Sequence, residues 1–141
     1  DRSKGGDAIP LMLSDARAAL DRGCRIIIFP EGTRKAPLAV PDYKYGIVRM
    51  YEELHVPVVP VALDSGLYWG RRSLLLRPGT ARARFLPAID PGLSGEAFFA
   101  ALQESIETGS DALLLDAIAH GHGHGLTPQQ QTRLESLKAT R

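Results

Sequence analysis

The chain has 141 residues, of which 44% are hydrophobic and 23% are charged, and its formal net charge at pH 7 is +1. This size and apolar content fit one globular domain, and the nearly neutral balance excludes the strongly basic field of most nucleic-acid-binding domains. The single Cys24 excludes an intrachain disulfide, and we expect it to be a small buried residue in a reducing compartment. No apolar stretch approaches the roughly 20 residues of a membrane-spanning helix.

Helix and strand patterns alternate in the first half of the chain. Residues 7–22 place apolar side chains at helical spacing and Gly23 follows as a stop signal, which predicts a helix. The β-branched run at residues 24–29 predicts a strand covered on both faces, as in a parallel sheet. Residues 43–54 predict a second helix, because their apolar and charged side chains fall on opposite faces.

Two more strands are indicated after this helix. Residues 56–63 are rich in valine, but Pro57 and Pro60 point to an edge strand or to a bulge. Residues 81–89 alternate small or apolar side chains with charged ones, as expected for a half-exposed strand.

A long helix is predicted next, from Ser94 towards Ile118, and Gly109 is the position where it could bend. Together with the preceding elements it completes an alternation of helices and strands. Such alternation predicts an α/β fold, in which crossover helices cover a layered sheet.

The end of the chain differs in composition, so we divide the sequence into residues 1–119, a Gly/His linker at 120–126 and a short polar helical tail at 127–141. Thr127 is the expected N-cap of that tail helix, with Gln130 at the capping-box position. The alternating histidines of "HGHGHG" could bind a transition metal, but a solvated glycine-rich linker is favoured and we assign no metal.

The stretch "FPEGTR" at residues 29–34 places polar side chains directly after the apolar run. Ligands of α/β proteins bind beyond the carboxyl ends of strands. Glu31 can accept hydrogen bonds, Gly32 permits close approach of a ligand, Thr33 offers a hydroxyl and Arg34 offers a planar fork for phosphate. The set suits a phosphorylated substrate; the alternative is a plain turn in which Glu31 and Arg34 pair in solvent.

Other chemistries lack their motifs in this sequence. Neither of the glycine-rich phosphate-binding patterns occurs, and neither does the G-x-S-x-G pattern of a serine nucleophile. A second polar cluster, Arg71 and Arg72 beside Tyr68 and Trp69, could face anionic lipid headgroups or be a solvated loop.

Three blocks of this sequence resemble motifs of the glycerolipid acyltransferases, specifically the 1-acyl-sn-glycerol-3-phosphate acyltransferases. They are "DRS" at residues 1–3, "FPEGTR" at 29–34 and "VPVVPVAL" at 56–63, and the likeness extends over most of residues 1–119. The fourth block of that family, an H-x4-D dyad, is absent because none of the four histidines has an aspartate five positions later.

The resemblance implies a glycerol-3-phosphate acyltransferase-like fold, of which residues 1–119 form the C-terminal part. It implies that Arg2 and Arg34 hold the acceptor's phosphate, with Glu31 and Gly32 shaping the same pocket. Lys44 follows this block at a position often occupied by a lysine in the family, although it could equally be a solvated helix residue.

The implied reaction moves an acyl chain from acyl-CoA or acyl carrier protein to the sn-2 hydroxyl of lysophosphatidate, giving phosphatidate in phospholipid biosynthesis. No cofactor and no nucleic acid are implied. The chain begins at Asp1 rather than Met, so we expect an upstream part that carries the catalytic dyad and a membrane-associating segment, at the cytoplasmic face of the cell membrane. We therefore predict no catalytic residue within this chain and no activity of the chain alone. The alternative is a non-catalytic lipid-phosphate-binding or scaffolding domain.

Overall fold

The computed structural model describes residues 8–71, 73–123 and 125–139. In these ranges it contains helices joined to one short pair of strands. The helices are α1 (Ala8–Asp21), α2 (Gly46–Leu54), the 3-10 helix η1 (Ser65–Leu67), α3 (Gly95–Ala119) and α4 (Pro128–Ala139), and the strands are β1 (Val61–Leu63) and β2 (Ala83–Phe85). None of the helices described is both long and apolar enough to cross a membrane.

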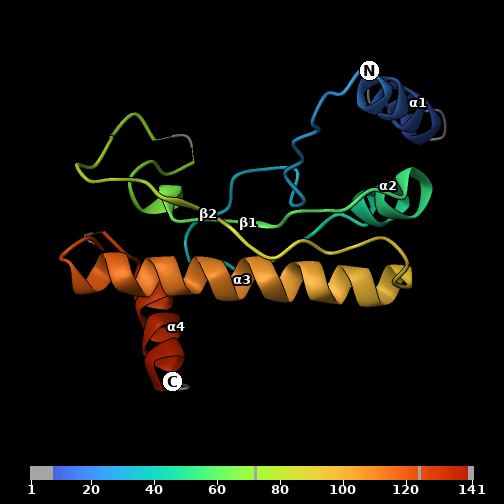
Figure 1. The fold of residues 1–141 in the computed structure, drawn as a ribbon. Helices are drawn as coiled ribbons and strands as arrows, with labels where there is room; N and C mark the ends of the chain where they lie inside the picture. Colours follow the sequence, from blue (N-terminus) through green and yellow to red (C-terminus); the bar gives the residue numbers. More distant parts are fainter. Residues whose placement is uncertain (1–7, 72, 124, 140–141) are drawn as a thin grey trace.

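Helix α3 is the longest element, and the strands and the other helices are arranged along it (Figure 1). The N-terminal half of α3 packs against α2, where the rings of Tyr51 and Phe98 stack with their centroids 3.8 Å apart. The C-terminal half packs against η1, with Leu67 and Leu114 in a second apolar cluster. A third cluster joins α1 to α2 on the far side, around Ala16, Met50 and Leu54.

The two strands form an antiparallel ladder with Val61 opposite Phe85 and Leu63 opposite Ala83. Farther along, Val58 pairs with Ile89, so two residues on one chain segment lie opposite three on the other. This mismatch is a bulge. The register continues through Pro60, whose carbonyl accepts from the N–H of Leu86 at 3.0 Å, so the extra residue lies on the second segment, between Leu86 and Ile89. Of the two alternatives predicted for residues 56–63, the edge position is the one found, because β1 belongs to a two-stranded sheet in the described part of the chain. The strands predicted at 56–63 and 81–89 are both shorter than expected.

The strand predicted at residues 24–29 is wrong. These residues form no ladder with any described segment, and Ile27 and Phe29 are 83% and 68% exposed. Cys24, expected to be buried, is exposed just after the turn at Gly23 that ends α1. The apolar run has the composition of a buried strand, but a strand needs a partner, and no described segment supplies one.

The expected mixture of helices and strands is confirmed, but the layered sheet with crossover helices is not seen among the described residues. Their sheet has two strands, which run antiparallel to each other. Helix α2 begins at Gly46 rather than at residue 43. Lys44, which precedes it, is bonded to an earlier segment, since its N–H donates to the carbonyl of Pro30 at 2.8 Å.

Helix α3 continues without interruption through Gly109, so the bend considered there does not occur. This glycine instead lets α3 approach β1 closely. A Cβ atom at position 109 would lie 2.8 Å from the Cβ of Ala62 and 3.0 Å from a methyl group of Leu86. Contacts this short require the helix or the strand to move.

We expect Gly109→Ala to destabilise the fold by about 1–2 kcal/mol, because the overpacking cost exceeds the gain in helix propensity. Gly46→Ala is the matched control, since a Cβ at that helical position meets nothing within 4 Å. Urea titration of both variants measures the difference. A Gly109→Ala protein more stable than the parent would show that α3 and β1 are not in close contact.

The capping box predicted for the tail helix is confirmed: the Thr127 N–H donates to Gln130 at 2.7 Å, and the Gln130 N–H donates to the Thr127 hydroxyl at 3.3 Å. The segment before it is only partly solvated, in contrast to the free linker we expected: His120, Gly121 and Gly125 are exposed, but two other residues make contacts. The ring of His122 meets Tyr68 edge to face with centroids 5.6 Å apart, and Leu126 packs on the cluster around Leu67. These contacts bury apolar area that a free linker would leave in water.

Candidate functional site

The "FPEG" stretch forms a tight turn. The N–H of Gly32 donates to the carbonyl of Phe29 at 2.9 Å, and Gly32 has a φ of +63°. Proline at the second turn position and glycine at the fourth are favoured in such turns, and the positive φ suits glycine. The motif therefore sets its own local geometry.

This turn is docked on the residues that precede α2. The N–H of Lys44 donates to the Pro30 carbonyl at 2.8 Å, and the N–H of Asp42 donates to a carboxylate oxygen of Glu31 at 3.4 Å. A Cβ on Gly32 would lie 3.9 Å from Cγ of Lys44. The structure thus brings together three of the predicted site residues, Glu31, Gly32 and Lys44.

The positive charges near the turn are partly compensated by Asp42. Its carboxylate lies 2.7 Å from Nζ of Lys44 and 3.6 Å from Nζ of Lys35. The hydrogen bond from Lys44 lowers the pKa of Asp42, so this carboxylate stays ionised at neutral pH. An anionic ligand has to compete with Asp42 for the ammonium group of Lys44.

Arg34 is arranged differently. It is exposed, and its guanidinium carbon lies 5.0 Å from the centre of the Trp69 ring. Arg34 and Glu31 form no ion pair in the described part of the chain, so the alternative of a solvent-paired turn is wrong. A guanidinium stacked on an aromatic face keeps its hydrogen-bond donors free for a phosphate. Thr33 is exposed as well, and Arg2 lies outside the described residues.

An apolar groove of about 580 Å³ leads to the turn, between α1 and the segment after it. A smaller cavity of about 160 Å³ continues to Lys44. Both are lined by Met12, Ile28, Phe29, Gly32 and Met50. The smaller cavity is as apolar as the groove, and Lys44 is the one charged residue among the described residues that line it.

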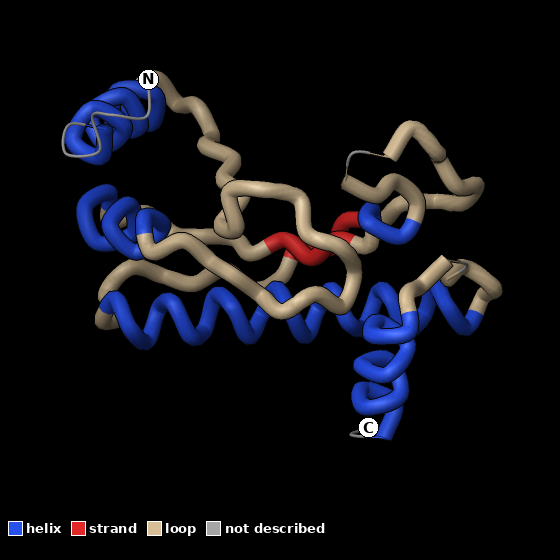
Figure 2. Tube along the Cα trace, turned by 180° about the vertical axis from the view of Figure 1, so that it is seen from behind, coloured by secondary structure: helices blue, strands red, loops and turns tan. Residues whose placement is uncertain are grey.

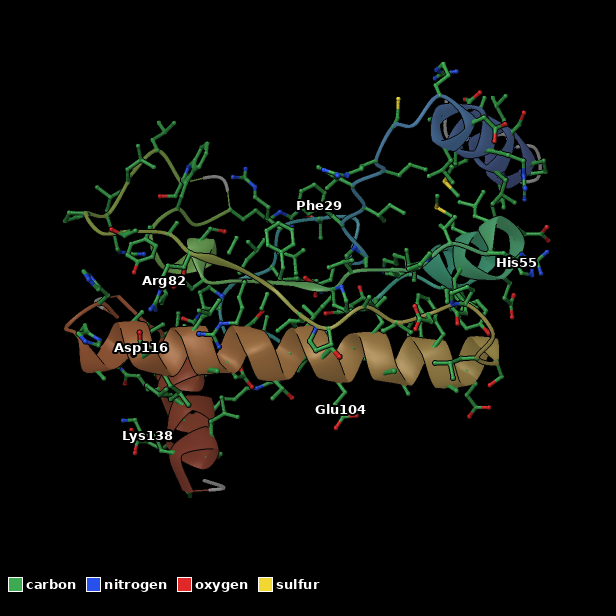
Figure 3. All side chains as sticks on the ribbon, viewed as in Figure 1. Phe29, His55, Arg82, Glu104, Asp116 and Lys138 are labelled. Carbon is green, nitrogen blue, oxygen red and sulfur yellow. The ribbon has the colours of Figure 1, made fainter. Side chains whose placement is uncertain are left out.

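His55 does not belong to this site. Its side chain is exposed. Its backbone has the left-handed conformation, with φ of 53°, and caps the C-terminal end of α2. Lys44 precedes the other end of this 9-residue helix, about 13 Å away along the axis. Figure 3 likewise places His55 at the outer end of α2, away from Phe29.

Two polar clusters were not predicted from the sequence. In the first, the hydroxyl of Tyr43 donates to Glu107 at 2.9 Å. Burial raises the pKa values of both groups, and the negative charge of Glu31 adds to this effect. The pair is a half-buried contact between the site segment and α3, and nothing in the local sequence around Glu107 indicated it.

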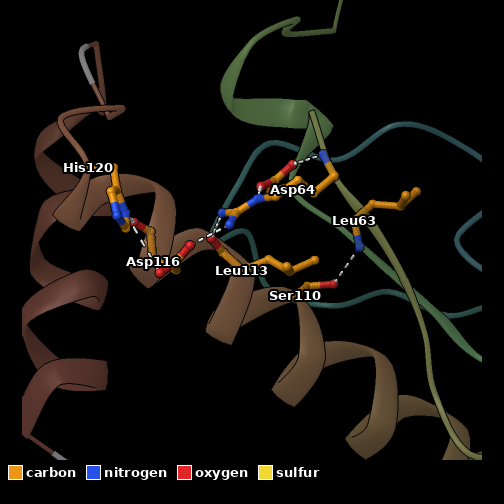
Figure 4. A network of polar contacts seen from close by, with 7 residues as sticks. Leu63, Asp64, Ser110, Leu113, Asp116 and His120 are labelled. Carbon is orange, nitrogen blue, oxygen red and sulfur yellow. Dashed lines mark hydrogen bonds and ion pairs between the residues drawn. The ribbon is translucent and has the colours of Figure 1, made fainter. Parts of the chain in front are cut away.

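The second cluster centres on Arg82 (Figure 4). Its backbone N–H and its Nε donate to the buried carboxylate of Asp64 at 2.6 and 2.9 Å. Its two terminal nitrogens donate to Asp116 and, at 2.7 Å, to the carbonyl of Leu113. The hydrogen bond from Arg82 holds the pKa of Asp116 below its usual range. This network ties β1 and β2 to α3; the only sequence signal was an aspartate directly after a valine-rich strand.

Comparisons with known proteins define the class first. Residues 1–64 match the family model described as Acyltransferase. All three motif blocks quoted above lie in this range.

The curated proteins to which the chain is similar are more specific in their names. The chain is 31% identical over 91 residues to the 1-acyl-sn-glycerol-3-phosphate acyltransferase alpha of Mus musculus, covering 63% of this chain and 32% of the relative. It is 32% identical over 91 residues to the 1-acyl-sn-glycerol-3-phosphate acyltransferase of Limnanthes alba, covering 64% and 32%. Over 107 residues it is 28% identical to the enzyme of that name from Pseudomonas aeruginosa, covering 76% and 42%.

The match of residues 1–64 to the Acyltransferase model and the names of these relatives support the predicted resemblance to the glycerolipid acyltransferase family. The match spans about a third of the length of the first two relatives, that is, 32% of each. No solved structure matches the chain significantly.

Proposed function

We propose that this protein is an acyltransferase that moves an acyl chain from acyl-CoA or acyl carrier protein to the sn-2 hydroxyl of lysophosphatidate, giving phosphatidate. The observation that carries the proposal is the turn at Gly32, which lies where the apolar groove meets Lys44. A lysophospholipid has the same pattern, with one apolar chain attached to a phosphate. The match to the family model and the names of the relatives support this assignment.

Each site residue has a role in this proposal. Arg34 offers its fork to the phosphate, and Lys44 adds a second positive charge when the phosphate displaces Asp42. Gly32 permits close approach of the ligand, Glu31 holds the turn through the N–H of Asp42, and Thr33 offers a hydroxyl. Arg2 would join the phosphate site. These groups orient an acceptor, which reduces the entropic cost of the reaction.

The transfer itself needs a base. The acceptor hydroxyl gives its proton to that base and attacks the thioester carbonyl; the new C–O bond forms, the C–S bond breaks, and the thiolate leaves and takes up a proton. These 141 residues contain no H-x4-D pair. We propose that a dyad of this type, outside these residues, supplies the base, that no cofactor takes part, and that the reaction takes place at the cytoplasmic face of the cell membrane.

The experiment measures lysophosphatidate binding by calorimetry, alongside thiol release from acyl-CoA. We expect the 141-residue chain to bind lysophosphatidate without turnover, and a protein that also carries the dyad to form phosphatidate. Absence of binding by the folded chain would refute the assigned site. Turnover by the chain alone would mean that a group other than an H-x4-D histidine takes the proton.

A non-catalytic lipid-phosphate-binding or scaffolding domain is the second candidate. The observation that favours it is the missing H-x4-D pair. It predicts the same lysophosphatidate binding, but no phosphatidate formation in any longer form of the protein.

A further inference from the structure

The hairpin that follows η1, described at residues 69–71 and 73–76, presents leucines to solvent. Leu74 is fully exposed, and Leu75, Leu76 and Trp69 are between 53% and 66% exposed. Large apolar side chains gathered on one exposed turn are uncommon on the surface of a monomer and mark an interaction site.

Hydrogen bonds tie together the described residues of this hairpin. Trp69 and Leu76 form an antiparallel bridge at its base, and the indole N–H of Trp69 donates to the carbonyl of Ser73 at 3.0 Å. The Ser73 hydroxyl accepts from the N–H of Leu75 at 3.1 Å. The loop is thus internally bonded, while its leucines have no apolar partner in any described cluster. The leucines therefore point to solvent from a hydrogen-bonded loop.

The charged residues of this hairpin are all positive. Residues 69–77 contain three arginines and no acidic residue. Arg71 is exposed, and Arg34 adds a further guanidinium against the face of Trp69. Arg77 is half-buried at the base, where its guanidinium donates to the Leu67 carbonyl at 3.4 Å. An apolar tip is therefore bordered by cations.

We infer that residues 69–76 insert into the surface of an anionic lipid bilayer, with Leu74–Leu76 in the acyl region and Trp69 and Arg71 at the level of the headgroups. Tryptophan and arginine prefer this boundary, and leucine prefers the region below it. A second copy of the chain is a poorer occupant, because a symmetric contact through the tip would bring Arg71 of both copies together. Anionic headgroups compensate the same charges.

This inference goes beyond the proposed function, because it concerns lipid attachment and requires no acyl donor. In Figures 1 and 2 the hairpin projects on the side of α3 opposite to α4, so the rest of the fold leaves its tip accessible. The contact between Arg34 and Trp69 joins the hairpin to the "FPEGTR" turn. Insertion would therefore bring the proposed acceptor site to the lipid surface, where lysophospholipids reside.

Trp69 is the only tryptophan of the chain, which makes fluorescence a local probe. The 141-residue chain is mixed with vesicles of phosphatidylcholine alone or with added phosphatidylglycerol, and with the same vesicles carrying brominated acyl chains. We expect a blue shift and bromine quenching with the anionic vesicles only. An unchanged spectrum with bound vesicles, or equal binding to both compositions, would overturn the inference.

Variants separate the contributions. Replacing Leu74, Leu75 and Leu76 together by serine should weaken vesicle partitioning at least about tenfold, and Arg71→Ala should weaken it about fivefold. Leu93→Ser, an exposed leucine before α3, is the matched control and should leave partitioning unchanged. Circular dichroism checks that each variant is folded.

Two further outcomes would count against insertion. Serine variants that bind as tightly as the parent would show that another surface attaches to the lipid. A blue shift that depends on protein concentration without vesicles, together with dimer formation in sedimentation, would assign the hairpin to a contact between copies.

Discussion

Arg82→Ala should produce the largest loss of stability, lowering the thermal midpoint by on the order of 10 °C. The reason is the buried carboxylate of Asp64, which accepts from both the backbone and the side chain of Arg82. Without the guanidinium this carboxylate remains in the interior with one backbone donor, which costs about 3 kcal/mol. The contacts to α3 at Asp116 and Leu113 are lost in the same change.

Calorimetric or circular-dichroism melting of three variants tests this explanation. Arg84→Ala, an exposed residue of β2 two positions after Arg82, is the control and should melt within about 1–2 °C of the parent. Adding Asp64→Asn to Arg82→Ala should recover part of the loss, because it removes the unpaired charge. If Arg84→Ala were as damaging as Arg82→Ala, the network would have no special role.

Arg34→Ala should produce the largest functional loss, a reduction of kcat/KM for lysophosphatidate on the order of 10²-fold in the active protein. Arg34 is exposed, stacked on Trp69 and without a carboxylate partner in the described ranges, so its donors are free for the acceptor's phosphate. The change should appear mainly as a higher apparent KM, because the phosphate is held in both the ground state and the transition state.

Steady-state kinetics with varied lysophosphatidate measures the effect, with acyl-CoA held at saturation. Arg34→Lys keeps the charge but loses the planar fork, so we expect an intermediate loss. Arg25→Ala, an exposed arginine on the preceding segment, is the control and should behave as the parent does. Kinetics unchanged in a folded Arg34→Ala protein would remove Arg34 from the acceptor site.

Local patterns in the sequence were enough to predict most elements. The helices at Ala8–Asp21 and Gly95–Ala119, and the capping box of the tail helix, follow from periodicity and from residues within one turn of each other. The "FPEG" turn also has local causes in Pro30 and Gly32, although we considered a turn there only as an alternative; its motif was sufficient to indicate the family. All of these features depend on near neighbours in the chain, and near neighbours are visible in a sequence.

The contacts that organise these elements were not visible. The Arg82 network joins residues 18 and 34 positions apart, and Arg34 meets Trp69 from 35 positions away; no periodicity encodes such distances. Residues 24–29 show the converse, since an apolar run predicts a strand but only a partner makes one. Strand pairing, close helix packing at Gly109 and the outward leucines of the hairpin were decided by tertiary structure, because each depends on what another segment places opposite it.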